Sequence, residues 1–267
     1  MDACIIIPAR YASTRYPGKP LVSLKGASGV SRSLIERSVM AARAASAGVI
    51  PVYVATDDQR IADAAKALGV EVIMTSESCR NGTERVAEAL RNAGISADII
   101  VNLQGDAPLT PPHFVTALIE AMRADPDCGM ATPCLRCDEE TVKNLLTDRA
   151  EGRVGATTVV ADKAGRALYF SKEVIPFTNG KGVVEGRVPV FHHVGVYAYR
   201  PAALTAYAGW EQGPLETLEG LEQLRFLENG HPIKVVDVQA PGAKFWELNN
   251  PSDVPLIEGY LAAMGWE

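Results

Sequence analysis

The chain has 267 residues, of which 47% are hydrophobic and 22% are charged, and its formal net charge is −6. This composition is typical of a folded globular protein and excludes a disordered or fibrous chain. An acidic chain whose apolar runs are all too short to span a bilayer is expected to bind neither nucleic acid nor membrane, and we expect one domain over residues 1–267.

The amino-terminal part alternates short apolar strands with helices. Strands are predicted at residues 4–7, 52–55, 70–75 and 99–103, and helices at residues 33–45, 59–68 and 83–93. Such alternation is typical of a doubly wound parallel sheet. Asp57 and Asp58 are expected to open the second helix, where acidic side chains suit the helix dipole, and Gly69 is expected to end it.

The pattern changes after Pro111. We expect a helix through Ala124, an irregular stretch at residues 125–152, and extended segments at 154–161, 167–170 and 189–199 that look antiparallel. Alternation then returns, with a helix at 215–228, a strand at 233–238 and a helix at 251–264. The predicted fold class is therefore α/β, with a mostly parallel doubly wound sheet and a smaller antiparallel lobe.

A basic loop follows the first strand. Between Ala3 and Ile35 the chain has no Asp or Glu, but it carries Arg10, Arg15, Lys19, Lys25 and Arg32. Arginine forks, a lysine and backbone N–H groups are what a triphosphate needs, and Ser13, Thr14 and Gly18 offer hydroxyls and a close backbone approach. We therefore predict that this loop holds a triphosphate, the alternative being a merely solvated basic loop.

Two common nucleotide motifs are missing from the chain. It has no G-x-x-x-x-G-K-[ST] phosphate loop, and no G-x-G-x-x-G follows its first strand, which excludes a P-loop kinase and a usual dinucleotide enzyme. Asp106 instead follows a predicted strand and is expected beside the basic loop if the two strands are neighbours. A carboxylate there is a candidate Mg²⁺ ligand, and a turn aspartate after Gly105 is the competing interpretation.

Several motifs together resemble one family. They are Ile7–Leu21 (IPARYASTRYPGKPL), Asn81–Arg85 (NGTER), Val101–Asp106 (VNLQGD), Ala167–Ser171 (ALYFS), His193–Tyr197 (HVGVY) and Pro214–Arg225 (PLETLEGLEQLR). The chain resembles the 3-deoxy-manno-octulosonate cytidylyltransferases, also called CMP-Kdo synthetases, along nearly its full length. The resemblance implies a nucleotide-diphospho-sugar transferase-like fold in which CTP and a sugar acid give the CMP-sugar and pyrophosphate, for lipopolysaccharide or capsule biosynthesis.

The same resemblance implies roles for individual residues. It assigns catalysis to Arg10, Arg15, Lys19 and Asp106; nucleotide binding to Pro8, Ala9, Arg10, Ser13, Lys19, Asn81, Gly82, Arg85 and Gln104; and sugar binding to Gln104, His193, Tyr197, Glu222 and Gln223. It also implies a homodimer, formed through a lobe at roughly residues 150–200 that covers the sugar site. Arg80, where the family often has Gln, could add charge for a carboxylate.

Simpler interpretations stay open for these residues. His193 and Tyr197 are predicted to point to one face of an extended segment, where a packed core histidine is the usual case. Glu222 and Gln223 could lie on the solvated face of an amphipathic helix. The run after Asn81 is also ordinary chemistry for the start of a helix.

The metal site departs from the family pattern. Mg²⁺ is the implied cofactor, held by Asp106 and by a second aspartate near the carboxyl terminus, but Asn249 stands at that second position. A neutral amide attracts Mg²⁺ less than a carboxylate does. Glu247 or Asp253 could substitute, and Ala107 stands where the family usually has Glu. These changes leave two alternatives open: a modified sugar acid, either the 8-amino relative or a nonulosonate, or a nucleotide-binding homologue without activity.

The cysteines indicate a reducing compartment. There are five of them, an odd number, and the amino terminus lacks the pattern of a signal peptide, so free thiols in the cytoplasm are expected. Cys134 and Cys137 have metal-like spacing, but a zinc site needs more ligands. We expect this pair to sit in or beside a strand.

Overall fold

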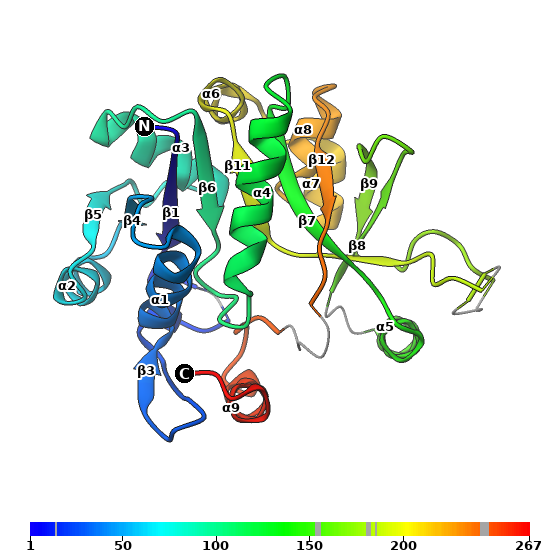
Figure 1. The fold of residues 1–267 in the computed structure, drawn as a ribbon, viewed down its shortest axis with the longest axis horizontal. Helices are drawn as coiled ribbons and strands as arrows, with labels where there is room; N and C mark the ends of the chain where they lie inside the picture. Colours follow the sequence, from blue (N-terminus) through cyan, green and yellow to red (C-terminus); the bar gives the residue numbers. More distant parts are fainter. Residues whose placement is uncertain (14, 153–155, 180–182, 185, 241–245) are drawn as a thin grey trace. The chain divides into compact units, whose positions relative to one another are not determined.

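The computed structural model describes residues 1–13, 15–152, 156–179, 183–184, 186–240 and 246–267 (Figure 1). These residues divide into two compact units, the first made of Met1–Ile119 with Pro241–Glu267 and the second of Glu120–Ala240. The expected lobe at roughly residues 150–200 falls inside the second unit. Among the described residues, no helix is both long and apolar enough to cross a membrane.

The first unit contains a parallel sheet in the order β5-β4-β1-β6. Its strands are β1 (Ala3–Ala9), β4 (Val52–Thr56), β5 (Glu71–Met74) and β6 (Ile99–Leu103). Ile5 of β1 pairs with Val52 on one side and Val101 on the other, and β1 is buried along its whole length. A strand buried on both faces has no polar face, which is why its sequence is continuously apolar.

Helices α1 (Leu34–Ser46), α2 (Gln59–Ala67) and α3 (Gly82–Ala93) connect these strands. The side chains of Ser33, Asp58 and Asn81 accept backbone N–H groups and so begin α1, α2 and α3 respectively. Gly69 follows α2 with φ +68°, a conformation that favours glycine. The predicted strands and helices of this part are thus confirmed, as are the roles of Asp58 and Gly69, whereas Asp57 precedes the cap of α2 and does not open the helix.

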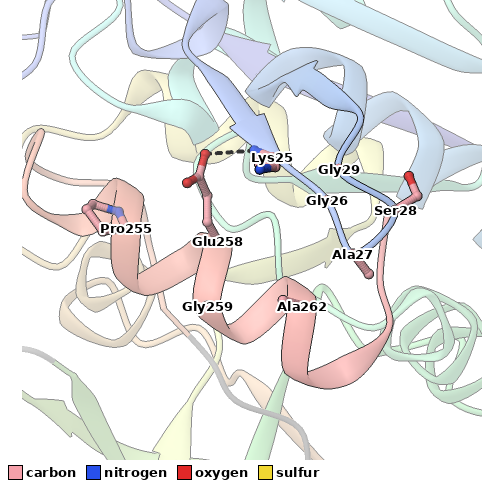
Figure 2. A pocket seen from close by; sticks show the side chains of 9 residues that line it. All are labelled: Lys25, Gly26, Ala27, Ser28, Gly29, Pro255, Glu258, Gly259 and Ala262. Carbon is pink, nitrogen blue, oxygen red and sulfur yellow. Dashed lines mark hydrogen bonds between the residues drawn. The ribbon is translucent and has the colours of Figure 1, made fainter.

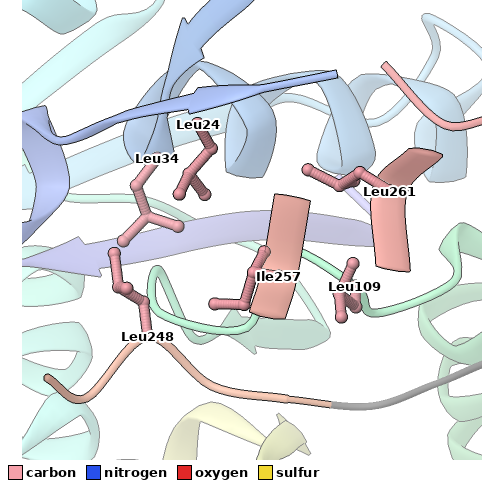
Figure 3. Packing of buried hydrophobic residues seen from close by; sticks show 6 residues of the cluster. All are labelled: Leu24, Leu34, Leu109, Leu248, Ile257 and Leu261. Carbon is pink, nitrogen blue, oxygen red and sulfur yellow. The ribbon is translucent and has the colours of Figure 1, made fainter. Parts of the chain in front are cut away.

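The remaining elements of the first unit bring distant segments together. They are the short helix η1 (Lys19–Leu21), the hairpin of β2 (Ser23–Lys25) and β3 (Ser31–Ser33), α9 (Asp253–Met264) and the start of α4 (Pro112–Ala124). Figure 3 shows the apolar cluster of Leu24, Leu34, Leu109, Leu248, Ile257 and Leu261. Burying these side chains holds the segment before α9 against the loop that follows β6.

The second unit is built around β7 (Met130–Arg136). Along one edge β7 pairs antiparallel with β10 (Phe191–His193) and β11 (Val196–Tyr199), and along the other it pairs parallel with β12 (Lys234–Asp237). β8 (Thr157–Ala161) pairs antiparallel with both β10 and β9 (Ala167–Ser171). The antiparallel interpretation of the middle of the chain is confirmed.

Two predictions for the second unit are wrong. Residues 125–152 are regular, since they contain all of β7 and the helix α5 (Glu139–Ala150). The helix expected at 215–228 is two helices, α7 (Pro214–Glu219) and α8 (Leu224–Glu228), while α6 (Pro201–Gly209) precedes them. Gly220, with φ +63°, ends α7 in the left-handed conformation, which the Leu/Glu periodicity of the segment does not reveal.

Candidate active site

The basic loop leaves the carboxyl end of β1 in the first unit. Pro8 and Ala9 are buried at the end of the strand, whereas Arg10 and Arg15 are exposed. The Ser13 hydroxyl accepts the Tyr16 N–H at 3.4 Å, and Gly18 turns the chain into η1 with φ +72°. Thr14 lies outside the described residues. The loop therefore presents two exposed arginines beyond a rigid strand end.

Lys19 and Asp106 meet at the end of this loop. The Lys19 Nζ donates to Asp106 Oδ2 at 2.9 Å, and both side chains are partly exposed. Asp106 follows β6, which pairs with β1, and a Cβ on Gly105 would lie 3.0 Å from the Pro8 carbonyl oxygen. The expectation that Asp106 lies beside the basic loop is confirmed, because the ends of neighbouring parallel strands meet at one edge of the sheet.

Asn249 lies in the same group. Its side-chain oxygen accepts from Arg15 Nη2 at 2.9 Å, and the backbone N–H of Leu248 donates to the Asp106 carbonyl at 2.9 Å. Asp253 begins α9 and accepts the N–H groups of Asn249 and Asn250 on one carboxylate oxygen, at 2.9 and 2.6 Å. Asp253 thus orders the turn that carries Asn249.

Glu247 adds a second carboxylate to this group. Asn249 Nδ2 donates to Glu247 Oε2 at 3.3 Å. Neighbouring protein groups displace part of the water around the Glu247 carboxyl, although the residue is exposed, and repulsion from Asp106 adds to this, so that its pKa rises to about 7. Two carboxylates that repel each other next to an amide oxygen form an oxygen-rich donor set of the kind that hard divalent cations prefer.

The start of α3 lies against the end of β6. Asn81 accepts the Glu84 N–H through its side chain at 2.9 Å. A Cβ on Gly82 would lie 3.0 Å from the Gln104 amide atoms and 3.3 Å from the Pro8 ring, so any larger residue would push these side chains aside by a few tenths of an ångström. The structure therefore brings together Pro8, Gly82 and Gln104, three of the residues predicted to bind nucleotide.

Arg85 and Arg80 are held by neighbouring acids. The Arg85 guanidinium is almost fully buried, donates to Asp57 Oδ2 at 2.9 Å, and contacts Thr75 Oγ1 at 2.6 Å. Arg80 is paired with Glu84 one turn along. Nucleotide binding by Arg85 stays a prediction, and its ion pair with Asp57 gives it a structural role within the unit.

Four of the five predicted sugar-binding residues lie in the second unit, and the fifth, Gln104, lies in the first. His193 in β10 is buried, and its ring centroid is 5.7 Å from that of Tyr197 in β11. Because Thr132 Oγ1 donates to the Val196 carbonyl at 2.9 Å, it accepts from His193 Nε2 at 2.9 Å. The Tyr197 hydroxyl donates to Gln223 Oε1 at 3.2 Å. Tyr197 thus contacts both His193 and Gln223, and the role of these three residues in binding sugar stays a prediction.

Glu222 and Gln223 occupy the break between α7 and α8. The Tyr207 hydroxyl donates to the Glu222 carbonyl at 3.2 Å, and the buried Gln223 Nε2 finds no hydrogen-bond partner among the residues that the structure describes. Beneath the break, Arg225 donates from Nε and Nη2 to the Glu216 carboxylate at 2.6 and 2.7 Å, both side chains being buried. This ion pair joins the two helices and fixes the intervening segment.

The five cysteines are buried and free. Burial raises the pKa of Cys134 to about 12 and that of Cys137 to about 11, so both remain thiols at neutral pH. Cys134 lies in β7 and Cys137 just after it, as expected. Within the described ranges, no group of three or more His, Cys, Asp or Glu side chains could hold a metal.

The hollow shown in Figure 2 lies elsewhere. It has a volume of about 560 Å³ and lies between the β2–β3 hairpin and α9, where the Lys25 N–H donates to Glu258 Oε1 at 2.8 Å. Lys25 of the acid-free basic stretch lines it, but none of the residues assigned individually to nucleotide, sugar or metal does. We therefore take the group around Lys19 and Asp106 as the candidate site of the first unit.

Sequence reasoning missed two contributors to this unit. The sequence suggests Glu247 only as a substitute for Asn249. Its position two residues before Asn249 is a signal that could have identified it. Asp57 was interpreted as a helix-opening residue, but it precedes the cap and pairs with Arg85. The run Thr56-Asp57-Asp58 at a strand end could have pointed to it.

Comparison with known proteins finds cytidylyltransferases that are similar to this chain. A family model described as "Cytidylyltransferase" matches residues 4–235. The 3-deoxy-manno-octulosonate cytidylyltransferase of Maricaulis maris is 46% identical over 265 residues, covering 99% of each chain. The 8-amino-3,8-dideoxy-manno-octulosonate cytidylyltransferase of Shewanella piezotolerans is 39% identical over 264 residues, covering 98% of this chain and 99% of its own.

A solved structure resembles the chain over its full length. It is a CMP:2-keto-3-deoxy-manno-octonic acid synthetase complexed with CTP, 34% identical, with a TM-score of 0.80 and coverage of 99% of this chain and 100% of the other. The similarity confirms the predicted fold class.

Proposed function

This chain belongs to the cytidylyltransferase family, and from that premise we propose that it activates 3-deoxy-manno-octulosonate with CTP, giving the CMP-sugar and pyrophosphate. The enzyme is a CTP-dependent nucleotidyltransferase. The anomeric hydroxyl of the sugar attacks the α-phosphorus of CTP and loses its proton to water. A P–O bond to that phosphorus forms, and the bond from it to the oxygen bridging the α- and β-phosphates breaks, so that this oxygen leaves with pyrophosphate. This reaction needs positioning and charge neutralisation rather than a covalent nucleophile.

The observation that carries the proposal is the meeting of the basic loop with Asp106. Lys19 lies 2.9 Å from the Asp106 carboxylate at the end of a loop that exposes Arg10 and Arg15. Cations there neutralise the triphosphate and the departing pyrophosphate. Pro8, Gly82 and Gln104 pack together at the adjacent end of the sheet, where the nucleoside is proposed to bind.

The donor set near Asp106 fits Mg²⁺. Asp106 would hold the ion, with the Asn249 oxygen and the Glu247 carboxylate available beside it. When bound, Mg²⁺ polarises phosphate oxygens and offsets their charge. The chain's own residues orient this group, because Asp253 orders the Asn249 turn and Leu248 fixes it to the Asp106 backbone.

Within the second unit, the sugar acid is assigned to His193, Tyr197, Glu222 and Gln223. Gln223 supports this assignment, because its buried Nε2 is a donor in need of an acceptor such as a sugar hydroxyl or carboxylate. His193 and Tyr197 lie next to one another, and the Tyr197 hydroxyl donates to Gln223 Oε1.

A second candidate is the same reaction on the 8-amino sugar acid. The relative from Shewanella piezotolerans, named for that substrate, is 39% identical to this chain. Asn249 and Ala107 also depart from the family pattern beside the proposed metal.

The experiment is pyrophosphate release from CTP and Mg²⁺ with each sugar acid in turn. We expect the larger kcat/KM with 3-deoxy-manno-octulosonate. A larger value with its 8-amino form would transfer the assignment to the second candidate, and a nonulosonate is the third member of the panel.

We further propose that the protein is a homodimer in the cytoplasm. The second unit exposes Leu168, Phe177 and Leu218 by 63%, 88% and 82%, and exposed large apolar side chains favour association. The five free thiols suit a reducing compartment. Sedimentation of the purified protein tests the dimer.

A further inference from the structure

The basic loop is also contacted by a residue that is not assigned to substrate binding. The Arg60 guanidinium, in the first turn of α2, lies over the ring of Tyr11, with Cζ 3.3 Å from the ring centroid. We propose that Arg60, acting through Tyr11, is a positioning residue for the triphosphate-binding loop. The inference rests on the proposed function of that loop and adds a residue from another element to it.

Tyr11 is the residue on which the loop folds. Its carbonyl accepts the N–H groups of Ser13 and Gly18, at 3.0 and 2.9 Å. Its ring packs on Gly18, where a Cβ would lie 3.0 Å from ring atoms, so the glycine has room for nothing larger. Because Gly18 directly precedes Lys19, the place of the Tyr11 ring sets where the Lys19 side chain begins.

Arg60 is itself held in orientation. Its Nε and Nη2 donate to the two oxygens of Asp58 at 3.0 and 2.6 Å, and Asp58 also accepts the Arg60 N–H as the cap of α2. The Arg60 side chain is 59% exposed, so core packing does not explain its place. A guanidinium over an aromatic face is attracted to it.

The contact between Arg60 and Tyr11 therefore holds the loop in an ordered conformation before nucleotide binds. A loop already in its bound conformation loses less entropy on binding, which strengthens affinity without adding a contact to the ligand. Removing an exposed cation–π contact is therefore expected to weaken CTP binding by about two- to fivefold. Folding should be unaffected, since Arg60 is exposed and the α2 cap stays.

The test uses the 267-residue chain, five single variants and one double variant. Arg60→Gln removes the contact, Arg60→Lys keeps a cation, Tyr11→Leu removes the ring and Tyr11→Phe keeps it. Lys66→Gln, an exposed residue of the last turn of α2, removes the same charge from the same helix away from Tyr11. Two quantities are measured: the Kd for CTP with Mg²⁺ by calorimetry, and hydrogen exchange of the Gly18 amide without nucleotide.

We expect Arg60→Gln and Tyr11→Leu each to raise the Kd and speed exchange at Gly18, with Arg60→Lys and Tyr11→Phe close to the unmodified chain. The Arg60→Gln/Tyr11→Leu double variant should be no weaker than the worse single variant, because both remove one interaction. Equal effects of Arg60→Gln and Lys66→Gln, or faster exchange with unchanged Kd, would overturn the proposal. Failure of the unmodified chain to bind CTP would instead overturn the proposed function, and the positioning role with it.

Discussion

The Lys19 ammonium lies 2.9 Å from the Asp106 carboxylate, although 86 residues separate them in the sequence. The contact exists because β1 and β6 are neighbours in a parallel sheet and end at the same edge. In this arrangement the Lys19 ammonium is paired with the carboxylate that we propose as a Mg²⁺ ligand. With both ligands bound, Asp106 would hold the Mg²⁺ and Lys19 would pair with a phosphate group, so the ion pair between the two residues would separate.

Replacing Asp106 by Asn should abolish most activity. The loss of an anionic ligand removes metal-assisted charge stabilisation worth several kcal/mol, so kcat/KM should fall on the order of a hundredfold or more. Pyrophosphate release across a Mg²⁺ titration measures it. Asp63→Asn, at an exposed position of α2, is the control. Unchanged activity would remove Asp106 from the metal site.

Replacing Asn249 by Asp should strengthen the response to Mg²⁺. A second carboxylate beside Asp106 attracts the ion more than an amide does, so the half-saturating Mg²⁺ concentration should fall. An unchanged Mg²⁺ dependence would contradict a ligand at this position. If activity appeared only in this variant, the natural chain would be a nucleotide-binding homologue.

Gly82→Ala should weaken CTP binding. Its Cβ would stand 3.0 Å from the Gln104 amide and 3.3 Å from Pro8, so the packing of the proposed nucleoside site must shift. Calorimetric CTP binding measures the effect. Gly259→Ala, in α9 with open space around the new Cβ, is the matched control. Equal affinities in the two variants would place the nucleoside elsewhere.

Glu216→Gln should destabilise the fold. It leaves the fully buried Arg225 charge without its carboxylate, a change that costs about 3–5 kcal/mol. Urea unfolding measures the loss, with the exposed Glu211→Gln as the control. Stability within 1 kcal/mol of the control, a margin typical of surface changes, would refute the structural role of the pair.

His193 should make the protein less stable in mild acid. Burial, followed by the nearby His192, lowers its pKa to about 3, against about 6.5 when unfolded. Between these values the unfolded chain binds the proton and the folded chain does not, so stability is full above pH 6.5 and falls as pH drops towards 3. The slope is about 1.4 kcal/mol per pH unit.

Urea unfolding at pH 7, 6 and 5 checks this, and His193→Gln should show a shallower decline because Gln can still donate to Thr132 but does not titrate. Parallel declines would show that the histidine is protonated in the folded protein.

Much of the first unit could be predicted from its sequence, because its signals are local. Continuous apolar strands, the caps Ser33, Asp58 and Asn81, and the turn at Gly69 each act within a few residues. Placing Asp106 beside Lys19 needed one further step, the neighbour relation of β1 and β6.

The second unit was harder to predict because its signals are long-range. β7 takes partners from residues 191–199 and 234–237, and no local pattern announces such pairing. The break at Gly220 interrupts a periodic Leu/Glu helix, and the Glu216–Arg225 pair that fixes it is a tertiary contact. The raised pKa of Glu247 likewise depends on the charge of Asp106, which follows a strand that is distant in the sequence.

The most direct test of the account is to identify the product formed from CTP, Mg²⁺ and 3-deoxy-manno-octulosonate by ³¹P NMR. We expect a new phosphodiester resonance from the CMP-sugar, together with an equal amount of pyrophosphate, appearing only when the sugar is present. Binding of CTP without any sugar-dependent phosphodiester, from this sugar or its 8-amino form, would contradict it.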